Sequence, residues 1–177
     1  KATKLIAAFD HRDIFIDPDP DPAKSWAERN RMFKLARSSW QDYNTKLMSK
    51  GGGIFPRSLK TIPLSPEIKA MTGLTVKSCT PNELIKALLK SSCDLLWFGG
   101  IGTYVRATHE TDAVVGDRTN DILRITAPEV GAKVVGEGAN LGFTQLARIE
   151  FDIHGGRINS DAIDNSAGVN SSDVEVN

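Results

Sequence analysis

Short apolar runs and helical patterns alternate along the chain. Lys4–Phe9 (KLIAAF) is an apolar run closed by an acidic residue, which is typical of a buried parallel strand. Pro81–Lys90 places its leucine and isoleucine side chains on one helical face and leads into the apolar run Asp94–Phe98 (DLLWF). A helix that leads into a buried strand is the unit from which parallel sheets are built. The pattern therefore predicts an α/β fold, with a mostly parallel sheet and helices on both of its faces.

Capping residues predict where the other helices begin and end. Ser25, with Glu28 three residues later, forms a capping-box pattern, so we expect a helix over Trp26–Ala36. Arg157–Asn159 is expected to be a short connector. Further N-caps are expected at Ser65, Thr80 and Thr144, and helix ends at Gly73 and Gly155-Gly156.

The stretch Val134–Thr144 (VVGEGANLGFT) is the first candidate binding segment. Two valines end a buried-strand pattern, and a loop with three glycines follows, with Glu137 and Asn140 inside it. In parallel α/β sheets, ligands bind beyond the carboxyl ends of strands, where small residues let backbone N–H and C=O groups approach them. An ordinary glycine-rich turn between a strand and a helix is the alternative.

A second glycine-rich segment follows the strand pattern Asp94–Phe98. Gly100-x-Gly102 is half of a dinucleotide-binding fingerprint, but Val105 stands where the third glycine is required. The segment is therefore a weak pyrophosphate loop. It is better interpreted as a second strand end that borders the same crevice as Val134–Thr144.

Asp10 closes the first apolar run. Dinucleotide-binding folds place a carboxylate at such a strand end, where it accepts hydrogen bonds from the ribose hydroxyls of adenosine. Arg12 follows closely and could instead pair with a 2′-phosphate, so Asp10 favours NAD over NADP only mildly. A plain strand-to-loop aspartate is the alternative.

Composition narrows the class of protein. The 177 residues are 40% hydrophobic and 25% charged, which is typical of one globular domain. The 22 Lys and Arg residues balance 22 Asp and Glu residues, which gives no reason to expect nucleic acid or an anionic membrane as a partner. Cys79 and Cys93 have no CxxC spacing, and no apolar run approaches the roughly 20 residues of a membrane span, so we expect a cytoplasmic location. Both ends lack natural start and stop signals, which suggests a segment of a longer polypeptide.

Four acidic residues fit part of a calcium-loop template. Asp17, Asp19, Asp21 and Glu28 occupy its positions 1, 3, 5 and 12, but Pro22 stands where the sharp turn requires glycine. A solvated loop stiffened by prolines is the better interpretation. The three histidines are isolated, and no grouping supports a nucleophilic serine or cysteine. We therefore predict no metal site.

The motif GEGANLGFT, together with NSAGV, resembles the bacterial NAD-specific glutamate dehydrogenases of the large-subunit type. The resemblance includes AAFDHRDIFIDPDPDP, DLLWFGGIGTYV and GGRINSDAIDNSAGVNSSDVEVN, and it spans nearly the whole chain. It implies that residues 1–177 form a single, partial NAD-binding domain with a Rossmann-like, doubly wound sheet that is incomplete at its N-terminal edge. It also implies a homo-oligomeric parent enzyme that oxidatively deaminates L-glutamate to 2-oxoglutarate and ammonia, with hydride transfer to NAD.

The resemblance assigns roles to residues at matching motif positions. Asp10 corresponds to the ribose-binding acid, and Gly99, Gly100 and Ile101 to strand-end contacts with the cofactor. The remaining assignments are Gly138 and Asn140 beside the nicotinamide ribose, Asn165 on the nicotinamide side, and Val169 and Ser172 at the distal carboxylate of the substrate.

Other parts of the family's site have no counterpart in the sequence. The family's glycine-rich pyrophosphate loop is expected upstream, and its catalytic lysine and aspartate are expected in a separate substrate domain. The fragment alone should therefore be inactive. A dehydrogenase for another amino acid and a non-catalytic nucleotide-sensing or interaction module are the rival interpretations.

Overall fold

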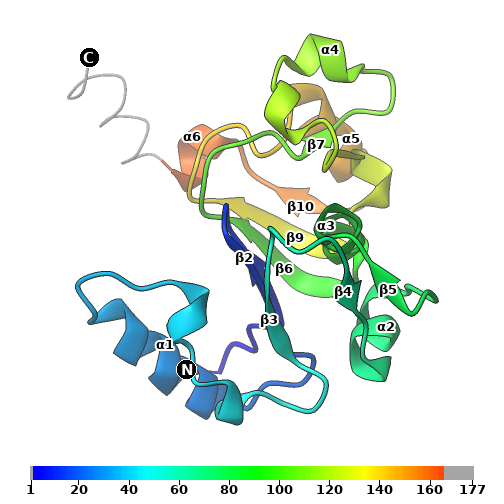
Figure 1. Cartoon of the computed structure of the whole chain (residues 1–177). Helices are drawn as coiled ribbons and strands as arrows, with labels where there is room; N and C mark the ends of the chain where they lie inside the picture. Colours follow the sequence, from blue (N-terminus) through cyan, green and yellow to red (C-terminus); the bar gives the residue numbers. More distant parts are fainter. Residues whose placement is uncertain (1, 166–177) are drawn as a thin grey trace. The chain divides into compact units, whose positions relative to one another are not determined.

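The computed structural model of the chain describes residues 2–165. The chain divides into two compact units, Lys1–Leu88 and Leu89–Asn177, and both contain helices and strands (Figure 1). The α/β class is confirmed. The single domain over residues 1–177 stays a prediction.

The first unit is built on an antiparallel sheet. Its strands β1 (Ala7–Phe9), β2 (Asp13–Ile16) and β3 (Gly53–Pro56) pair in the order β1-β2-β3. The parallel strand predicted for Lys4–Phe9 is therefore wrong. A short polar turn returns the chain at once, and the Asp10 carboxylate closes it by accepting hydrogen bonds from the N–H groups of Arg12 at 2.7 Å and Asp13 at 2.8 Å.

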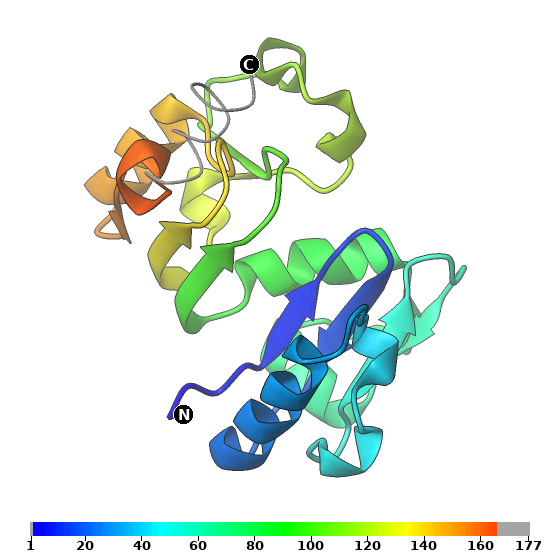
Figure 2. The ribbon, with the colours of Figure 1, turned by 90° about the vertical axis from the view of Figure 1, so that its left-hand side faces the viewer.

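Helix α1 (Pro22–Phe33) packs beside this sheet (Figure 2). Its N-cap is Asp21, whose side chain accepts from two backbone N–H groups of the first turn, with proline at the first helical position. The predicted cap at Ser25 is wrong, because this serine lies inside the helix and is buried. Met32 of the helix meets Phe15 of β2 and Tyr43 in the core of the unit.

The other elements of the first unit are short. Helix α2 (Pro66–Thr72) follows the predicted cap Ser65 and ends before Gly73, whose φ of 74° places it in the left-handed region. Helix α3 (Pro81–Lys90) has the predicted bounds, and Thr80 and Glu83 form the expected reciprocal capping bonds. The elements are η1 (Trp40–Asp42), η2 (Thr45–Leu47), β4 (Ile62–Pro63), α2 (Pro66–Thr72), β5 (Ser78–Cys79) and α3 (Pro81–Lys90), which leads into the second unit.

A three-stranded parallel sheet forms the centre of the second unit. Strands β6 (Cys93–Phe98), β9 (Ala132–Glu137) and β10 (Arg157–Ile158) lie in the order β10-β9-β6. Helix α5 (Gln145–Ile153) connects β9 to β10, so the predicted parallel pairing is confirmed here. The interpretation of Arg157–Asn159 as a connector is wrong, because its first two residues form β10.

The two faces of the parallel sheet differ. Phe98 and Val135 lie on the buried face, where Phe98 contacts Phe143 and Phe143 contacts Phe151 of α5. On the opposite face, Leu95 and Trp97 are 52% and 56% exposed. The doubly wound arrangement, with helices on both faces, therefore stays a prediction.

The remaining elements of the second unit are short. They are β7 (Val105–Arg106) and β8 (Ile125–Thr126), which pair in parallel, α4 (Asp112–Val115), η3 (Arg118–Asn120), η4 (Ala127–Glu129) and α6 (Asp161–Asp164). Across residues 2–165, no helix has both the length and the apolar character that crossing a membrane requires.

Glycine is required at position 131, directly before β9, because the backbone of Lys90 and Ser91 lies very close to it. A Cβ atom there would lie 2.3 Å from the carbonyl oxygens of both Lys90 and Ser91. We predict that Gly131→Ala destabilises the chain by about 2 kcal/mol, because the backbone that leads into β6 must move away from β9. Denaturant unfolding measures this.

Gly100→Ala is the matched control for that substitution. No atom of residues 2–165 lies within 4 Å of a Cβ built at Gly100, and its φ is not in the left-handed region. The unfolding midpoint should therefore stay at the wild-type value. Equal midpoints for both variants would contradict the packing role of Gly131.

Glu129 should make the stability of the second unit depend on pH. Burial opposes ionisation, but the Lys90 ammonium at 2.5 Å and the N–H and hydroxyl groups of Thr126 outweigh it and lower the pKa of Glu129 from 4.5 to about 2. Because the folded pKa lies below the unfolded value, this stabilisation is complete above pH 4.5 and is lost as the pH falls towards 2. After allowance for solvent screening of this half-exposed group, we expect a loss of about 1 kcal/mol.

Glu129→Gln tests this pH dependence. The variant should show a smaller loss of stability between pH 4.5 and pH 2 than the wild type, as measured by denaturant unfolding at each pH. Identical pH profiles would contradict the assignment.

Candidate functional site

Two predicted binding segments meet at the carboxyl edge of the parallel sheet. Strands β6 and β9 pair with Phe98 opposite Glu137, so Gly99 and Gly138 leave the sheet side by side. The Gly138 N–H donates to the Phe98 carbonyl at 2.7 Å. The structure therefore brings Gly99, Gly100 and Ile101 next to the loop that contains Gly138 and Asn140, as the crevice interpretation requires.

Glycine occurs at this edge of the sheet for two different reasons. A Cβ at Gly138 would lie 2.9 Å from the indole of Trp97, and one at Gly136 would lie 2.7 Å from it, so packing of the Trp97 ring requires both glycines. At Gly100, no described atom lies within 4 Å of such a Cβ. Protein packing therefore does not explain Gly100, and the open space beside it fits a closely approaching ligand.

The loop after β9 is tied to the segment around α6. The side-chain amide of Asn165 donates to the Asn140 side-chain oxygen at 3.1 Å, which joins two of the predicted residues. The Leu141 N–H donates to the Asp161 carboxylate at 3.1 Å, and the Glu137 N–H donates to Asp164 at 3.2 Å. The chain after β6, the loop after β9 and the segment around α6 thus all contribute to the carboxyl edge of the parallel sheet.

Glu137 does not lie in the loop, as its sequence position suggested. It is the last residue of β9 and is fully buried. One carboxylate oxygen lies 2.8 Å from the Arg148 guanidinium of α5, and the other accepts from the Gly142 N–H at 3.1 Å. Sequence reasoning missed Arg148, because one arginine in an amphipathic helix normally faces solvent.

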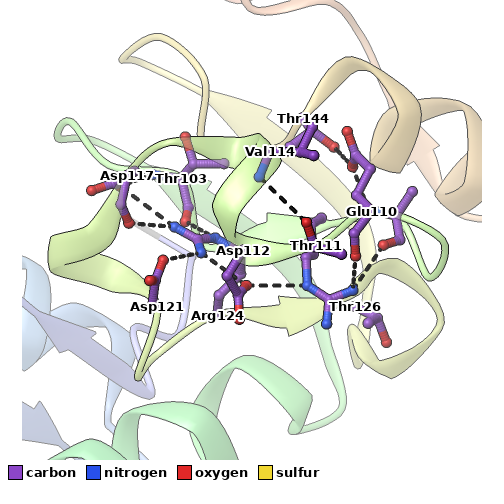
Figure 3. Close-up of polar contacts among 12 residues, drawn as sticks. Thr103, Glu110, Thr111, Asp112, Val114, Asp117, Asp121, Arg124, Thr126 and Thr144 are labelled. Carbon is purple, nitrogen blue, oxygen red and sulfur yellow. Dashed lines mark hydrogen bonds and ion pairs between the residues drawn. The ribbon is translucent and has the colours of Figure 1, made fainter.

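A second buried cation organises the chain between β6 and β9 (Figure 3). The Arg124 side chain is fully buried, and its guanidinium donates to the Thr103 carbonyl at 2.9 Å and to the carboxylates of Asp112 at 2.9 Å and Asp121 at 2.5 Å. It also donates to the Asp117 carbonyl at 2.6 Å. Burial opposes the charge, but these acids raise the pKa of Arg124, and its hydrogen bond lowers the pKa of Asp112.

Arg106 and Glu110 extend this network towards the loop after β9, and Figure 3 shows Glu110 beside Thr144. Arg106 donates to Asp112 at 3.1 Å and to the Glu110 carbonyl at 2.7 Å. The Glu110 carboxylate accepts from the Thr144 hydroxyl, which itself accepts from the Ala147 N–H and caps α5 as predicted. The network therefore links Thr103, which follows the glycine-rich segment after β6, to Thr144, which follows the loop after β9. No sequence pattern pointed to it, because residues 101–126 have no periodicity.

The other predicted site residues are less constrained. Asp10 lies in the first unit, where its carboxylate closes the turn between β1 and β2. Its ribose-binding role stays a prediction. Val169 and Ser172 lie outside the described residues, so their proposed contacts with the substrate also stay predictions.

The residues of the calcium-loop template have separate partners. Asp17 accepts from Ser49, Asp19 pairs with Lys4, Asp21 caps α1, and Glu28 pairs with Arg31 at 2.6 Å. Within residues 2–165, no group of three or more His, Cys, Asp or Glu side chains has the arrangement of a metal site.

Comparison with known proteins gives one consistent family. The profile described as "Bacterial NAD-glutamate dehydrogenase, catalytic domain" matches residues 1–177. The NAD-specific glutamate dehydrogenase of Mycobacterium tuberculosis is 57% identical over 183 residues, which covers 100% of this chain. The proteins of the same name from Pseudomonas aeruginosa and Halomonas elongata are 59% and 56% identical over 98% of it. The chain spans 11% of the length of each of these curated relatives.

We predict that Arg124→Met destabilises the chain by about 3 kcal/mol, because it removes the donor to two backbone carbonyl groups and to the carboxylates of Asp112 and Asp121. Arg124→Lys should recover only part of this loss, since one ammonium cannot reach all these acceptors. Denaturant unfolding measures both variants.

Lys133→Met is the matched control for Arg124→Met. It removes an exposed ion pair with Asp94 and should leave the unfolding midpoint unchanged. A wild-type unfolding midpoint for Arg124→Met would contradict the stabilising role of the Arg124 network between β6 and β9.

Proposed function

Because this chain belongs to the bacterial NAD-glutamate dehydrogenase family, we propose that it forms the NAD-binding segment of an enzyme that oxidatively deaminates L-glutamate to 2-oxoglutarate and ammonia. The supporting observation is the meeting of two glycine-bearing strand ends at one edge of a parallel sheet, with Asn140 and Asn165 beside them. Ligands of open α/β sheets bind at such edges.

The residues at the edge suit an extended, polar cofactor. The space beside Gly100 allows the backbone of Gly99 and Gly100 to approach a ligand without a side chain between them. The amides of Asn140 and Asn165 can donate to and accept from a ribose and a carboxamide. The roles that the resemblance assigns to other residues stay part of the proposal: Asp10, in the first unit, binds the adenosine ribose, and Val169 and Ser172 hold the distal carboxylate of glutamate.

NAD, when bound, accepts the hydride that the substrate loses. The task of this chain is then to hold the nicotinamide ribose and carboxamide in one orientation through Gly138, Asn140 and Asn165. Orientation of the reacting groups contributes a large share of the rate in such reactions. The proton-transfer residues are expected in another part of the parent protein.

We further propose that the parallel sheet of β6, β9 and β10 is part of a larger, doubly wound sheet. Its parallel order and the connection of β9 to β10 through α5 support this proposal. The exposed apolar side chains Leu95, Trp97 and Val134 support it as well, because such a face is normally covered in an α/β fold.

A homo-oligomeric parent enzyme, a cytoplasmic location and the absence of nucleic-acid or membrane partners complete the proposal. The balanced charge supports the absence of polyanionic partners, and the unpaired thiols of Cys79 and Cys93 support the location.

Activity of the full-length parent protein tests the function. We expect NADH formation from L-glutamate and NAD, and much less product when NADP replaces NAD or when leucine or phenylalanine replaces glutamate. Activity with leucine or phenylalanine instead would indicate a different amino-acid dehydrogenase. A folded full-length protein that is inactive with every pair would favour a nucleotide-sensing module.

Asn140→Ala in the same protein tests the location of the site. Loss of one amide contact should raise the KM for NAD about tenfold, without a change in melting temperature. Asn30→Ala, in α1, is the control and should leave the KM unchanged. An unchanged KM for Asn140→Ala would remove this loop from the cofactor site.

A further inference from the structure

The buried pair of Glu137 and Arg148 lies at the base of the loop Gly138–Gly142. We propose that this pair is a positioning device, which fixes the loop in the one conformation that receives the nicotinamide-ribose half of the cofactor. This inference rests on the proposed function. It adds Arg148, which no sequence motif singled out, and gives a role to Glu137, to which the sequence analysis assigned none.

Glu137 closes the loop on itself. The residue directly precedes the loop, and its carboxylate accepts from the N–H of the last loop residue, Gly142, at 3.1 Å. The other oxygen of the same carboxylate has no hydrogen-bond donor within residues 2–165, but it lies 2.8 Å from the Arg148 guanidinium, whose charge attracts it. Because the Glu137 side chain is fully buried, solvent does not compete with the hydrogen bond or screen the ion pair.

Arg148 joins the closed loop to the chain that follows β10. Its side chain is 5% exposed, and its guanidinium donates to the Asn159 carbonyl at 2.9 Å. It also lies 3.8 Å from the Asp161 carboxylate, which accepts from the Leu141 N–H. One cation therefore holds both the residue before the loop and the segment that binds the loop's far side.

The backbone of the loop shows which N–H groups remain available to a ligand when the Glu137–Arg148 pair is formed. The N–H groups of Gly138, Leu141 and Gly142 have acceptors within the second unit, whereas those of Ala139 and Asn140 have none in the described part of the chain. Leu141 has a φ of 59°, a left-handed conformation that is unfavourable for a non-glycine residue. The surrounding contacts thus impose a strained loop that presents two adjacent donors and the Asn140 amide.

A charged pair is required here by geometry rather than by stability. Two apolar side chains of similar volume could fill the same space with comparable stability. They could not, however, accept the Gly142 N–H or orient the segment that carries Asp161. Buried charge at this position therefore specifies the conformation of the loop.

Glu137→Gln in the full-length parent protein is the first test. The amide has one acceptor oxygen, so it cannot serve both the Gly142 N–H and the Arg148 guanidinium. We expect the Kd for NADH to rise about tenfold, while the Kd for ADP, which lacks the nicotinamide ribose, stays unchanged. Fluorescence titration of NADH, with ADP as competitor, measures both constants.

Lys133→Gln is the matched control. Lys133 pairs with Asp94 at 2.8 Å across the same two strands, β9 and β6, but both side chains are exposed. Its loss should change neither constant.

Asp161→Ala is the second variant, for the case that Glu137→Gln does not fold. The Asp161 side chain is 20% exposed, so its removal is better tolerated, and it frees the Leu141 N–H. Without cofactor, hydrogen exchange at Leu141 and Gly142 should be faster in both variants than in the wild type. Binding of NADH should weaken selectively in both.

Equal weakening of NADH and ADP binding would overturn the proposal, because the pair would then support the whole fold. Unchanged NADH binding in folded variants would overturn it as well. Failure of the proposed function is distinguishable. In that case Asn140→Ala also leaves NADH binding unchanged, although hydrogen exchange in the loop still responds to Glu137→Gln.

Discussion

Backbone pairing between β6 and β9 is the constraint on which the second unit depends. The two strands are far apart in the sequence, yet their register places Phe98 opposite Glu137 and so fixes where both chains leave the sheet. Gly131 allows β9 to begin against the backbone that precedes β6. The position of Gly99 beside Gly138 at the carboxyl edge follows from this register.

Two buried arginines stabilise the parts of the second unit that have little regular secondary structure. Between β6 and β9 the chain forms only short helical turns and two-residue strands, which cannot bury enough apolar surface to hold a loop in place. Arg124 and Arg148 each satisfy backbone carbonyls from separate segments, with acids to balance their charge. Charge-assisted hydrogen bonds are strong and directional, so they suit irregular backbone.

Local signals predicted much of the fold, and the errors have physical causes. Helix α3 was predicted with its correct bounds because its cap, proline and apolar face are all close in sequence. The start of α1 was wrong because Asp21 and Ser25 are both good caps, and the proline after Asp21 favoured the earlier one. Strand β10 was missed because a strand of two residues is too short to show an alternating pattern of apolar and polar side chains. The two glycine-rich strand ends were identified as neighbours, since parallel strands end at one edge. Arg124 and Arg148 could not be identified, because their partners lie on segments that only the folded chain brings together.

The indole of Trp97, resting on Gly136 and Gly138, gives the candidate site a natural optical probe. The other two tryptophans, Trp26 and Trp40, belong to the first unit, so emission from residues 89–177 comes from this ring alone. The ring is half-exposed and lies next to Gly99. Its emission wavelength and intensity therefore depend on the polarity at the carboxyl edge of the sheet. Events at that edge can be followed in the unlabelled protein, once the emission of Trp26 and Trp40 has been removed by substitution.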